Sequence, residues 1–453
     1  KNFDNLNVPV DLQNWMTVQT PNGFIYAANT TALLEFDGVT WQSYYLPNRS
    51  ALRSLEVDST GRIFVGGTRE FGYFFPDEFG QLQYYSLSAQ LDTIDFETVW
   101  KVLKTSDGIY FAAGRRYLYK YDGTKVKLLA APTVLQEYRA SVVDNTLYFY
   151  DMNAGFGFVE QDTLRLFKNS LLPDDFSVYF FMPHSGQELV VGVREHGLFL
   201  FYPDLDVLSW REATDLKFGQ NRAVLPVGDF QEGAVLHPVQ SNFNQFVAGQ
   251  GLYAGIKGVD KYYFSTLRQG VVVTDGRFNV INHYGKKTGI LSDAVYHVNI
   301  DNYGDCWFSG EMGISYVRGN SPFRFFNELN GIEGSILSVQ ESNGQLFIGT
   351  TKGLYVIKDG FDEMSNLHKA QLVTDEFLFV MNFTPLAENP DVFLVATLRD
   401  VVFFNTKTLK TRSIAKIYGT YDIKNIPFKK NQYVVGHVKG ADVLTVEMQG
   451  DRL

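Results

Sequence analysis

The sequence repeats a strand-rich unit about every 40 residues, and this repeat constrains the fold more than any other feature. Each copy has a short apolar strand, a polar turn that often carries Asp or Gly, a second strand, a short charged turn and a third strand. Residues 295–317 form the clearest copy, and residues 61–74 and 345–356 follow the same plan. Repeats of this length and content are typical of β-propeller blades.

The first apolar or aromatic residue of each second strand serves as a marker for one copy. Ten markers follow one another along the chain: Phe24, Ile63, Tyr110, Tyr148, Leu189, Tyr263, Trp307, Phe347, Phe393 and Tyr433. Successive markers are 38 to 47 residues apart, except for a gap of 74 residues after Leu189. We interpret residues 215–242 in that gap as an insertion, because they lack a clear third strand. The pattern predicts an all-β protein with ten propeller blades, each of four antiparallel strands.

Ten blades can form one ring of ten, or a closed ring of seven followed by three further blades. Residues 318–323 interrupt the repeat with Gly, Asn, Ser and Pro, as linkers do. We therefore predict a seven-bladed propeller over residues 1–322 and the first blades of a second, incomplete propeller over residues 323–453. A single ten-bladed ring is the alternative. Because three blades alone leave strand edges unpaired, the prediction implies that the second ring continues beyond residue 453.

The composition agrees with a β-rich protein and argues against several classes of function. Aromatic residues make up 15% of the 453 residues and there are 40 glycines, which suits short strands and tight turns. A formal net charge of −10 argues against nucleic acid or an anionic membrane as the main partner. The single cysteine and the seven scattered histidines show no metal-binding spacing. We expect no metal and no other cofactor.

The chain also shows no sign of a membrane-spanning or leader segment. Its apolar runs are far shorter than the ~20 residues that cross a bilayer. It begins at Lys1 without an apolar leader, so we expect that any secretion signal has been removed or was never present.

The best-formed repeats resemble a known family. Gly289-Ile-Leu-Ser-Asp-Ala-Val295, with residues 304–310 and 313–316, is similar to the two-component regulator propeller repeat. Residues 13–15, 33–38, 53–55 and 70–74 resemble the periplasmic sensor regions of regulators that carry a triple-tyrosine module and a LuxR-type DNA-binding domain.

This resemblance implies a periplasmic ligand sensor that is joined through a membrane helix to a kinase or a DNA-binding module. Relatives are associated mainly with polysaccharide utilisation. The sequence departs from the family pattern because it contains no output domain, its second ring is incomplete, and residues 215–242 have no counterpart.

Charged residues gather in turns that a propeller places on one face. The turn between second and third strands and the connection into the next first strand both open there. Arginine recurs in these turns, and its forked donors suit carboxylate, sulfate and sugar hydroxyl groups. The predicted ligand site consists of Arg69, Glu70, Arg115, Arg139, Arg194, Glu195, His196, Arg268 and Gln269. The connections into first strands also offer Arg53, Tyr138 and Arg222 as candidates.

A plainer interpretation exists for these residues and for the aromatic ones. Turn residues are commonly charged, and neighbours such as Arg69 and Glu70 can form local pairs of little energetic value. Aromatic residues within strand patterns, such as Trp100 and Trp307, are expected to pack between blades.

Three functions are compatible with these features. The sequence has no nucleophile elbow and no phosphate-binding loop, so we predict a non-enzymatic periplasmic sensor that binds a glycan fragment or another small polar ligand. Its second partner is a downstream signalling module of the same polypeptide, and a homodimer is left open.

One alternative is a carbohydrate-active hydrolase or lyase, since 50 acidic residues leave room for a catalytic pair. The other alternative is a protein-interaction platform.

Overall fold

The computed structural model describes most of the chain and divides it into two compact units. The described residues are 1–4, 10–130, 138–167, 172–173, 175–185, 188–201, 207–209, 236–319, 326, 328–358, 369–387, 389–429 and 431–447. The two units are Lys1–Ser321 and Pro322–Leu453. Among the described residues, the strands form ten antiparallel sheets, eight of which have four strands. The predicted all-β propeller class is confirmed.

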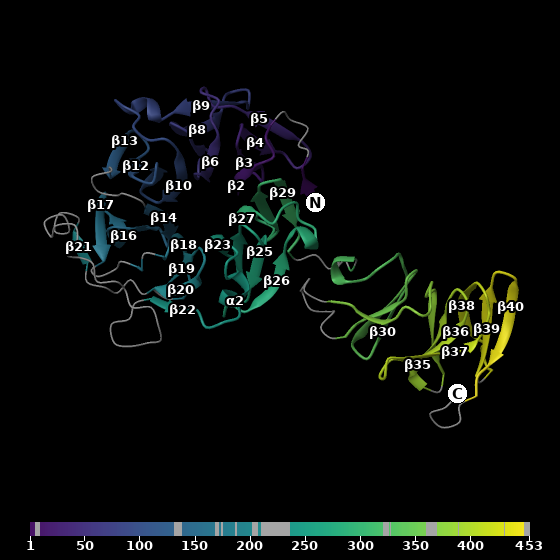
Figure 1. Ribbon diagram of the computed structural model, residues 1–453. Coiled ribbons are helices and arrows are strands. Elements are labelled where there is room, and N and C mark those ends of the chain that lie inside the picture. The colour runs from purple at the N-terminus through teal and green to yellow at the C-terminus, as the bar shows by residue number, and fades with distance from the viewer. Residues whose placement is uncertain are drawn as a thin grey trace. The chain divides into compact units, whose positions relative to one another are not determined.

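Seven sheets belong to the first unit and are arranged around a common axis (Figure 1). Their innermost strands are β2 (Asn14–Gln19), β6 (Leu52–Val57), β10 (Val99–Thr105), β14 (Tyr138–Val143), β18 (Val178–Pro183), β23 (Leu252–Lys257) and β27 (Val295–Ile300). The second strands are β3 (Ile25–Asn29), β7 (Ile63–Gly67), β11 (Gly108–Ala113), β15 (Thr146–Asp151), β19 (Leu189–Val193), β24 (Tyr262–Thr266) and β28 (Cys306–Gly310). Neighbouring sheets cover both faces of the second strands, so these strands are almost continuously apolar and buried.

The outer strands complete each sheet. The third strands are β4 (Leu33–Phe36), β8 (Glu70–Pro76), β12 (Tyr117–Tyr121), β16 (Gly155–Glu160), β20 (Gly197–Phe201), β25 (Val271–Thr274) and β29 (Gly313–Val317). The fourth strands are β5 (Trp41–Tyr44), β9 (Leu82–Ser86), β13 (Val126–Ala130), β17 (Thr163–Phe167), β22 (Leu236–Pro238), β26 (Val280–Tyr284) and β1 (Asn2–Phe3). Among the described residues of this unit, three short helices connect strands: η1 (Ser88–Gln90), α2 (Phe243–Val247) and η2 (Lys286–Thr288).

The first unit closes on itself through its N-terminal strand. The innermost strands contact one another in the cycle β2, β6, β10, β14, β18, β23, β27 and back to β2. At the seam, β1 pairs with β29, with Asn2 opposite Ser315 and Phe3 opposite Ile314. The last sheet therefore takes its outermost strand from the start of the chain. This closed cycle of seven sheets differs from the single ring of ten that the sequence left as an alternative.

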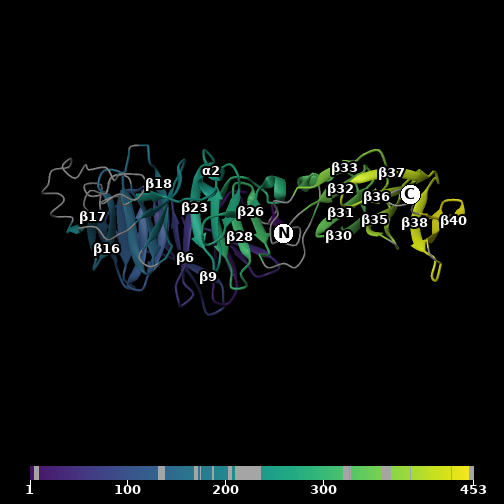
Figure 2. The ribbon, with the colours of Figure 1, turned by 90° about the horizontal axis from the view of Figure 1, so that it is seen from below.

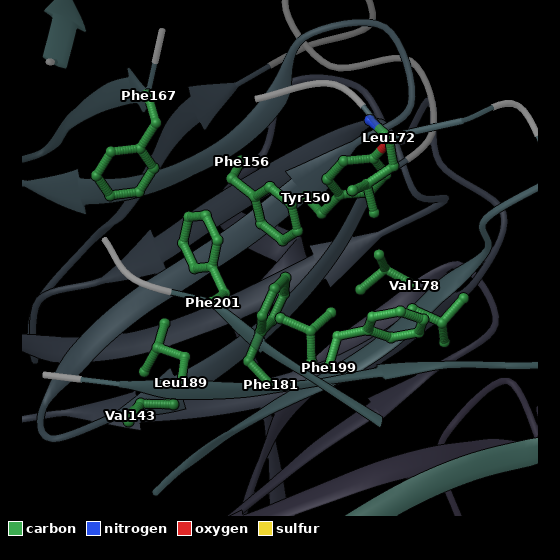
Figure 3. Packing of buried hydrophobic residues seen from close by; sticks show 12 residues of the cluster. Val143, Tyr150, Phe156, Phe167, Leu172, Val178, Phe181, Leu189, Phe199 and Phe201 are labelled. Carbon is green, nitrogen blue, oxygen red and sulfur yellow. The ribbon is translucent and has the colours of Figure 1, made fainter. Parts of the chain in front are cut away.

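Aromatic side chains fill the space between neighbouring sheets, which stand side by side in Figure 2. Figure 3 shows the cluster between the sheet of β14 to β17 and the sheet of β18 to β20. Phe156 stacks on Phe201 with ring centroids 4.4 Å apart and meets the edge of Phe181 at 5.7 Å. The Tyr150 hydroxyl accepts a hydrogen bond from the backbone N–H of Leu172 at 3.1 Å. Most of the aromatic surplus thus serves inter-sheet packing.

The structure differs in part from the insertion predicted at residues 215–242. Residues 210–235 lie outside the described residues. Residues 236–238, however, form β22, which pairs with β20 and completes its sheet. In addition, β21 (Val207–Ser209) pairs with β17 as a fifth strand of the preceding sheet. The end of the supposed insertion is thus part of a sheet, because β20 would otherwise have an unpaired edge.

A buried lysine links two neighbouring sheets. Lys120 lies on β12 with a side chain that is 6% exposed. Its ammonium donates to Asp107 Oδ2 at 2.7 Å and to Asp162, which lies in the β16–β17 turn of the next sheet. Charge-assisted hydrogen bonds of this kind are stronger than neutral ones.

We expect Lys120→Met to lower the free energy of unfolding by about 1–2 kcal/mol, because two carboxylates lose their shared partner. The hydrogen bond from Lys120 lowers the pKa of Asp162. A carboxyl group whose pKa is lowered by folding stabilises the protein above its ordinary pKa near 4, and this contribution is lost as the pH falls through the lowered value. Urea unfolding should therefore show a smaller difference at pH 3 than at pH 7. The exposed Lys125→Met is the control, and an equal effect of both variants would contradict the link.

The second unit contains three sheets. They consist of β30 (Ile336–Ser342), β31 (Gln345–Thr350), β32 (Leu354–Ile357) and β33 (Gln371–Thr374); β34 (Asn382–Leu386), β35 (Asn389–Ala396), β36 (Val401–Asn405) and β37 (Lys410–Ala415); and β38 (Thr420–Asn425), β39 (Gln432–His437) and β40 (Gly440–Thr445). A short helix, η3 (Glu328–Asn330), precedes them. The first and last sheets expose apolar side chains, among them Ile336, Val339, Val434 and Val443. Among the described residues, no helix of either unit has the length and apolar character of a membrane span.

Candidate functional site

Six of the seven innermost strands have a β-bulge near their start, and each bulge redirects one side chain. In six of the seven strands the pairing register shifts by one residue at the second position, and no such shift occurs in β14. A bulge leaves the extra residue unpaired and redirects its side chain. The residues at this position are Trp15, Arg53, Trp100, Arg139, Tyr179, Tyr253 and Tyr296. We call these seven residues the axis cluster.

The aromatic members of the axis cluster touch one another. Trp15 stacks on Tyr296 with ring centroids 4.5 Å apart. Tyr253 lies 5.6 Å from Tyr296 and 5.6 Å from Tyr179. Trp15 also meets the edge of Trp100 at 6.4 Å, although β6 lies between their strands in the ring. Contacts between strands that are not neighbours show that these side chains converge at the axis. All of them remain partly exposed, unlike the buried rings between sheets.

The structure therefore corrects the interpretation of Trp100, which the sequence analysis assigned to packing between blades. The bulge between Val99 and Lys101 turns it out of the inter-sheet packing. Strict alternation along the strand does not reveal this turn, because the extra residue of a bulge shifts the side-chain pattern by one position.

Arginine side chains lie on the faces of these rings. The guanidinium carbon of Arg53 is 4.1 Å from the ring centroid of Trp15 and 5.8 Å from that of Trp100. Cation–π attraction stabilises such pairs. Nε and Nη1 of Arg53 are buried and have no hydrogen-bond acceptor among the described residues. Burial lowers the pKa of Arg53, but a guanidinium stays charged at neutral pH.

Tyr179 holds a second group of arginines. Arg139 lies 5.3 Å from its ring centroid, and Arg194 Nη1 donates a hydrogen bond to its hydroxyl at 3.0 Å. Arg115 lies 5.6 Å from the ring of Trp100. Three arginines predicted from the turns therefore contact rings of the axis cluster.

Two more basic side chains follow cluster residues directly along the chain. Lys101 comes after Trp100 on β10, and His297 comes after Tyr296 on β27. Burial, with a smaller contribution from the charge of Lys101, lowers the pKa of His297 to about 3. Burial and the nearby charge of Arg139 lower the pKa of Lys101. Lys101 and His297 thus each follow an axis-cluster residue at a bulge, on β10 and on β27.

The other predicted site residues have different surroundings. Glu195 pairs with Arg194 at 3.5 Å and with Arg268 at 3.8 Å, so it lies next to the cluster. His196 stacks on Phe176 at 4.4 Å and lies 3.4 Å from Asp175. These contacts connect Glu195 and Arg268 to the cluster through Arg194, whereas His196 takes part in a local pair.

Arg69, Glu70 and Gln269 have structural contacts of their own. Arg69 donates to the carbonyl of Ile94 at 3.0 Å. The Gln269 backbone carbonyl bonds to the ring of His283 at 2.5 Å. Glu70 accepts hydrogen bonds from three hydroxyl groups, those of Tyr84, Ser86 and Ser88. A role of these residues in ligand binding stays a prediction.

The sequence reasoning missed four aromatic residues of the cluster, namely Trp15, Tyr179, Tyr253 and Tyr296. A signal for them exists. Every cluster residue precedes the second-strand marker of its repeat by 9 to 11 residues, and each is aromatic or arginine. Aligning the repeats on the first strand would have shown this column.

The axis cluster brings aromatic ring faces and guanidinium groups together in one place. The described residues contain no group of three or more His, Cys, Asp or Glu side chains that could hold a metal ion.

The architecture defines the class of the molecule as a β-propeller protein. No family model matches the sequence, and no curated protein is similar to it in sequence. A similar solved structure is the extracellular domain of a putative hybrid two-component system from B. thetaiotaomicron, with a TM-score of 0.64 and 16% identity. The match covers 97% of this chain and 58% of that one. The chain thus has the fold of a two-component-system propeller domain and spans little more than half of its length, in agreement with the resemblance seen in the sequence.

A second solved structure is less similar. An inactive variant of virginiamycin B lyase from Staphylococcus aureus matches with a TM-score of 0.49 and 12% identity, over 69% of this chain and 96% of that one. At 16% identity, the match to the extracellular domain describes the fold alone.

Proposed function

We propose that this chain is the ligand-sensing part of a periplasmic signalling protein and that the axis cluster binds the ligand. One observation carries the proposal: the same position of all seven innermost strands supplies an aromatic or arginine side chain to a single, partly exposed cluster. Strands hold side chains more accurately than loops do, which suits a binding site. Convergent polar groups among aromatic rings are characteristic of small-ligand sites.

The proposed ligand is a glycan fragment or another small polar molecule. Tyrosine and tryptophan rings offer flat apolar faces with a polar edge, and arginine adds forked donors for hydroxyl groups or anions. The proposed partner is a downstream signalling module of the same polypeptide. We further propose that the exposed apolar faces of the second unit, on β30 and on β39 and β40, are covered by additional sheets of a longer propeller.

Titration calorimetry of the chain against a panel of oligosaccharides tests the proposal. We expect at least one to bind, and we expect Trp100→Ala to weaken that binding at least tenfold, since tenfold corresponds to about 1.4 kcal/mol and a stacked ring contributes about that much. Tyr303→Ala is the matched control, because Tyr303 is exposed in the turn between β27 and β28.

Two results would contradict the proposal. One is a panel without any binding, and the other is binding that Trp100→Ala leaves unchanged. Release of shorter products from a bound oligosaccharide would favour the hydrolase or lyase alternative instead.

A further inference from the structure

We propose that the axis cluster binds an anionic group, a carboxylate or a sulfate ester, through Arg53, Lys101 and His297. The inference rests on the proposed function, since it names the chemical class of the ligand at the same site. It follows from unused hydrogen-bond donors and from uncompensated positive charge.

Two of these basic side chains have buried nitrogens without a hydrogen-bond partner among the described residues. Nε and Nη1 of Arg53 are buried and make no hydrogen bond with the described residues. Nδ1 of His297 is also buried without a partner. The Lys101 ammonium forms neither a hydrogen bond nor an ion pair within the described part of the chain. Buried polar atoms are almost always satisfied in folded proteins, so the unpaired nitrogens of Arg53 and His297, together with the ammonium of Lys101, indicate a binding partner.

The three side chains belong to one region although they come from three strands. Trp100 links two of them, because Arg53 lies over its ring and Lys101 follows it in a bulge. At a bulge, two consecutive residues oppose one residue of the partner strand. Likewise, His297 follows Tyr296 in the bulge of β27, and Tyr296 stacks on Trp15 beneath Arg53.

The positive charge near the axis lies on the arginines and on Lys101, because a pKa of about 3 leaves His297 uncharged near pH 7. The charge of Lys101 lowers the pKa of His297, and the charge of Arg139 lowers that of Lys101, each in addition to burial. Like charges held together away from water raise the free energy of the folded state. The chain as a whole carries a net charge of −10, so this positive centre contrasts with the rest of the protein. An anion would supply both the missing acceptors and the missing negative charge.

Arginine and aromatic rings together also indicate which anion fits. A carboxylate or sulfate group accepts paired hydrogen bonds from a guanidinium, and the adjacent rings of Trp15, Trp100 and Tyr296 can stack on the body of the ligand. An acidic or sulfated sugar combines these two features. Because the shared chemistry is the anion, the first test uses the anion alone.

Sodium sulfate and sodium acetate are each titrated into the full chain at constant ionic strength, balanced with chloride. Intrinsic tryptophan fluorescence reports binding, since two of the five tryptophans flank Arg53. We expect saturable binding of at least one of the two anions, weakened at least tenfold by Arg53→Gln and by Lys101→Met. Binding of acetate assigns a carboxylate, and binding of sulfate alone assigns a sulfate ester.

Thermal unfolding separates a binding role from a structural one. Removal of an uncompensated ammonium should leave the melting temperature of Lys101→Met unchanged or raised without anion, while abolishing the increase that the anion produces. A structural lysine would instead lower the melting temperature when replaced. Lys287→Met, at an exposed position of η2, is the matched control and should bind the anion as the unmodified chain does.

The inference is overturned if neither anion binds up to about 50 mM, far above the usual range of specific sites, or if both axis variants bind as tightly as the unmodified chain. Either of these results overturns the anion site alone. The proposed function is still supported if a neutral oligosaccharide binds and Trp100→Ala weakens that binding. Conversely, sulfate binding that depends on Lys101, without binding of any oligosaccharide, supports the anion site and removes the glycan proposal.

Discussion

Replacing Phe3 with alanine is expected to lower the free energy of unfolding of the first unit by about 3–5 kcal/mol, as for other buried phenylalanines. Phe3 is 7% exposed and lies at the seam where β1 pairs with β29. Its ring centroid is 5.3 Å from that of Phe36, 5.5 Å from that of Trp41 and 5.9 Å from that of Trp307. The substitution leaves a cavity between the first and last sheets of the ring. Chemical denaturation followed by circular dichroism measures the change.

Phe79→Ala is the matched control, because Phe79 is 83% exposed in the turn between β8 and β9. It should change the stability by less than about 0.5 kcal/mol, as surface substitutions usually do. If Phe3→Ala destabilises the protein no more than Phe79→Ala, the N-terminal strand does not hold the ring closed.

The second large effect is expected for Gly192→Val, with a loss of about 3 kcal/mol from overpacking. The ring of Phe180 on β18 lies between Gly192 and Gly255. A Cβ atom at Gly192 would lie 2.1 Å from Phe180 Cε1, and one at Gly255 would lie 2.6 Å from Phe180 Cε2. Both distances are far below van der Waals contact, so the buried ring would have to move.

The same mechanism predicts a partial rescue. Phe180→Leu should make Gly192→Val less harmful than in the unmodified protein, because the two sites share one space and their effects are not additive. Gly276→Val is the control, since a Cβ atom there has no neighbour within 4 Å. Equal effects at positions 192 and 276, measured by urea unfolding, would contradict the packing argument.

Local pattern accounts for the sheets. The repeat of about 40 residues, for example at 295–317, predicted strands that the structure contains, since alternation and turn residues encode a strand within a few residues. No comparable pattern in the sequence predicts how the ring closes. Strand β1 has two residues and pairs with residues more than 300 positions later in the chain, and so short a segment carries no recognisable strand pattern.

The site was predicted in part for a similar reason. Turn positions identified Arg115, Arg139 and Arg194, which contact rings of the axis cluster. Turn position did not separate them from Arg69, which instead donates to the carbonyl of Ile94. The difference depends on where each side chain points after the sheets have packed.

The amino-acid sequence alone thus establishes an all-β propeller with charged turns around an axis, because strand periodicity and turn chemistry are local properties. Only the tertiary structure decided that β1 closes the first unit and that bulges direct Trp15, Trp100 and Tyr296 to the axis instead of into the inter-sheet packing. The physical reason is that both features depend on contacts between distant segments. Strand pairing across the seam and convergence at the axis exist only once all seven sheets are in place.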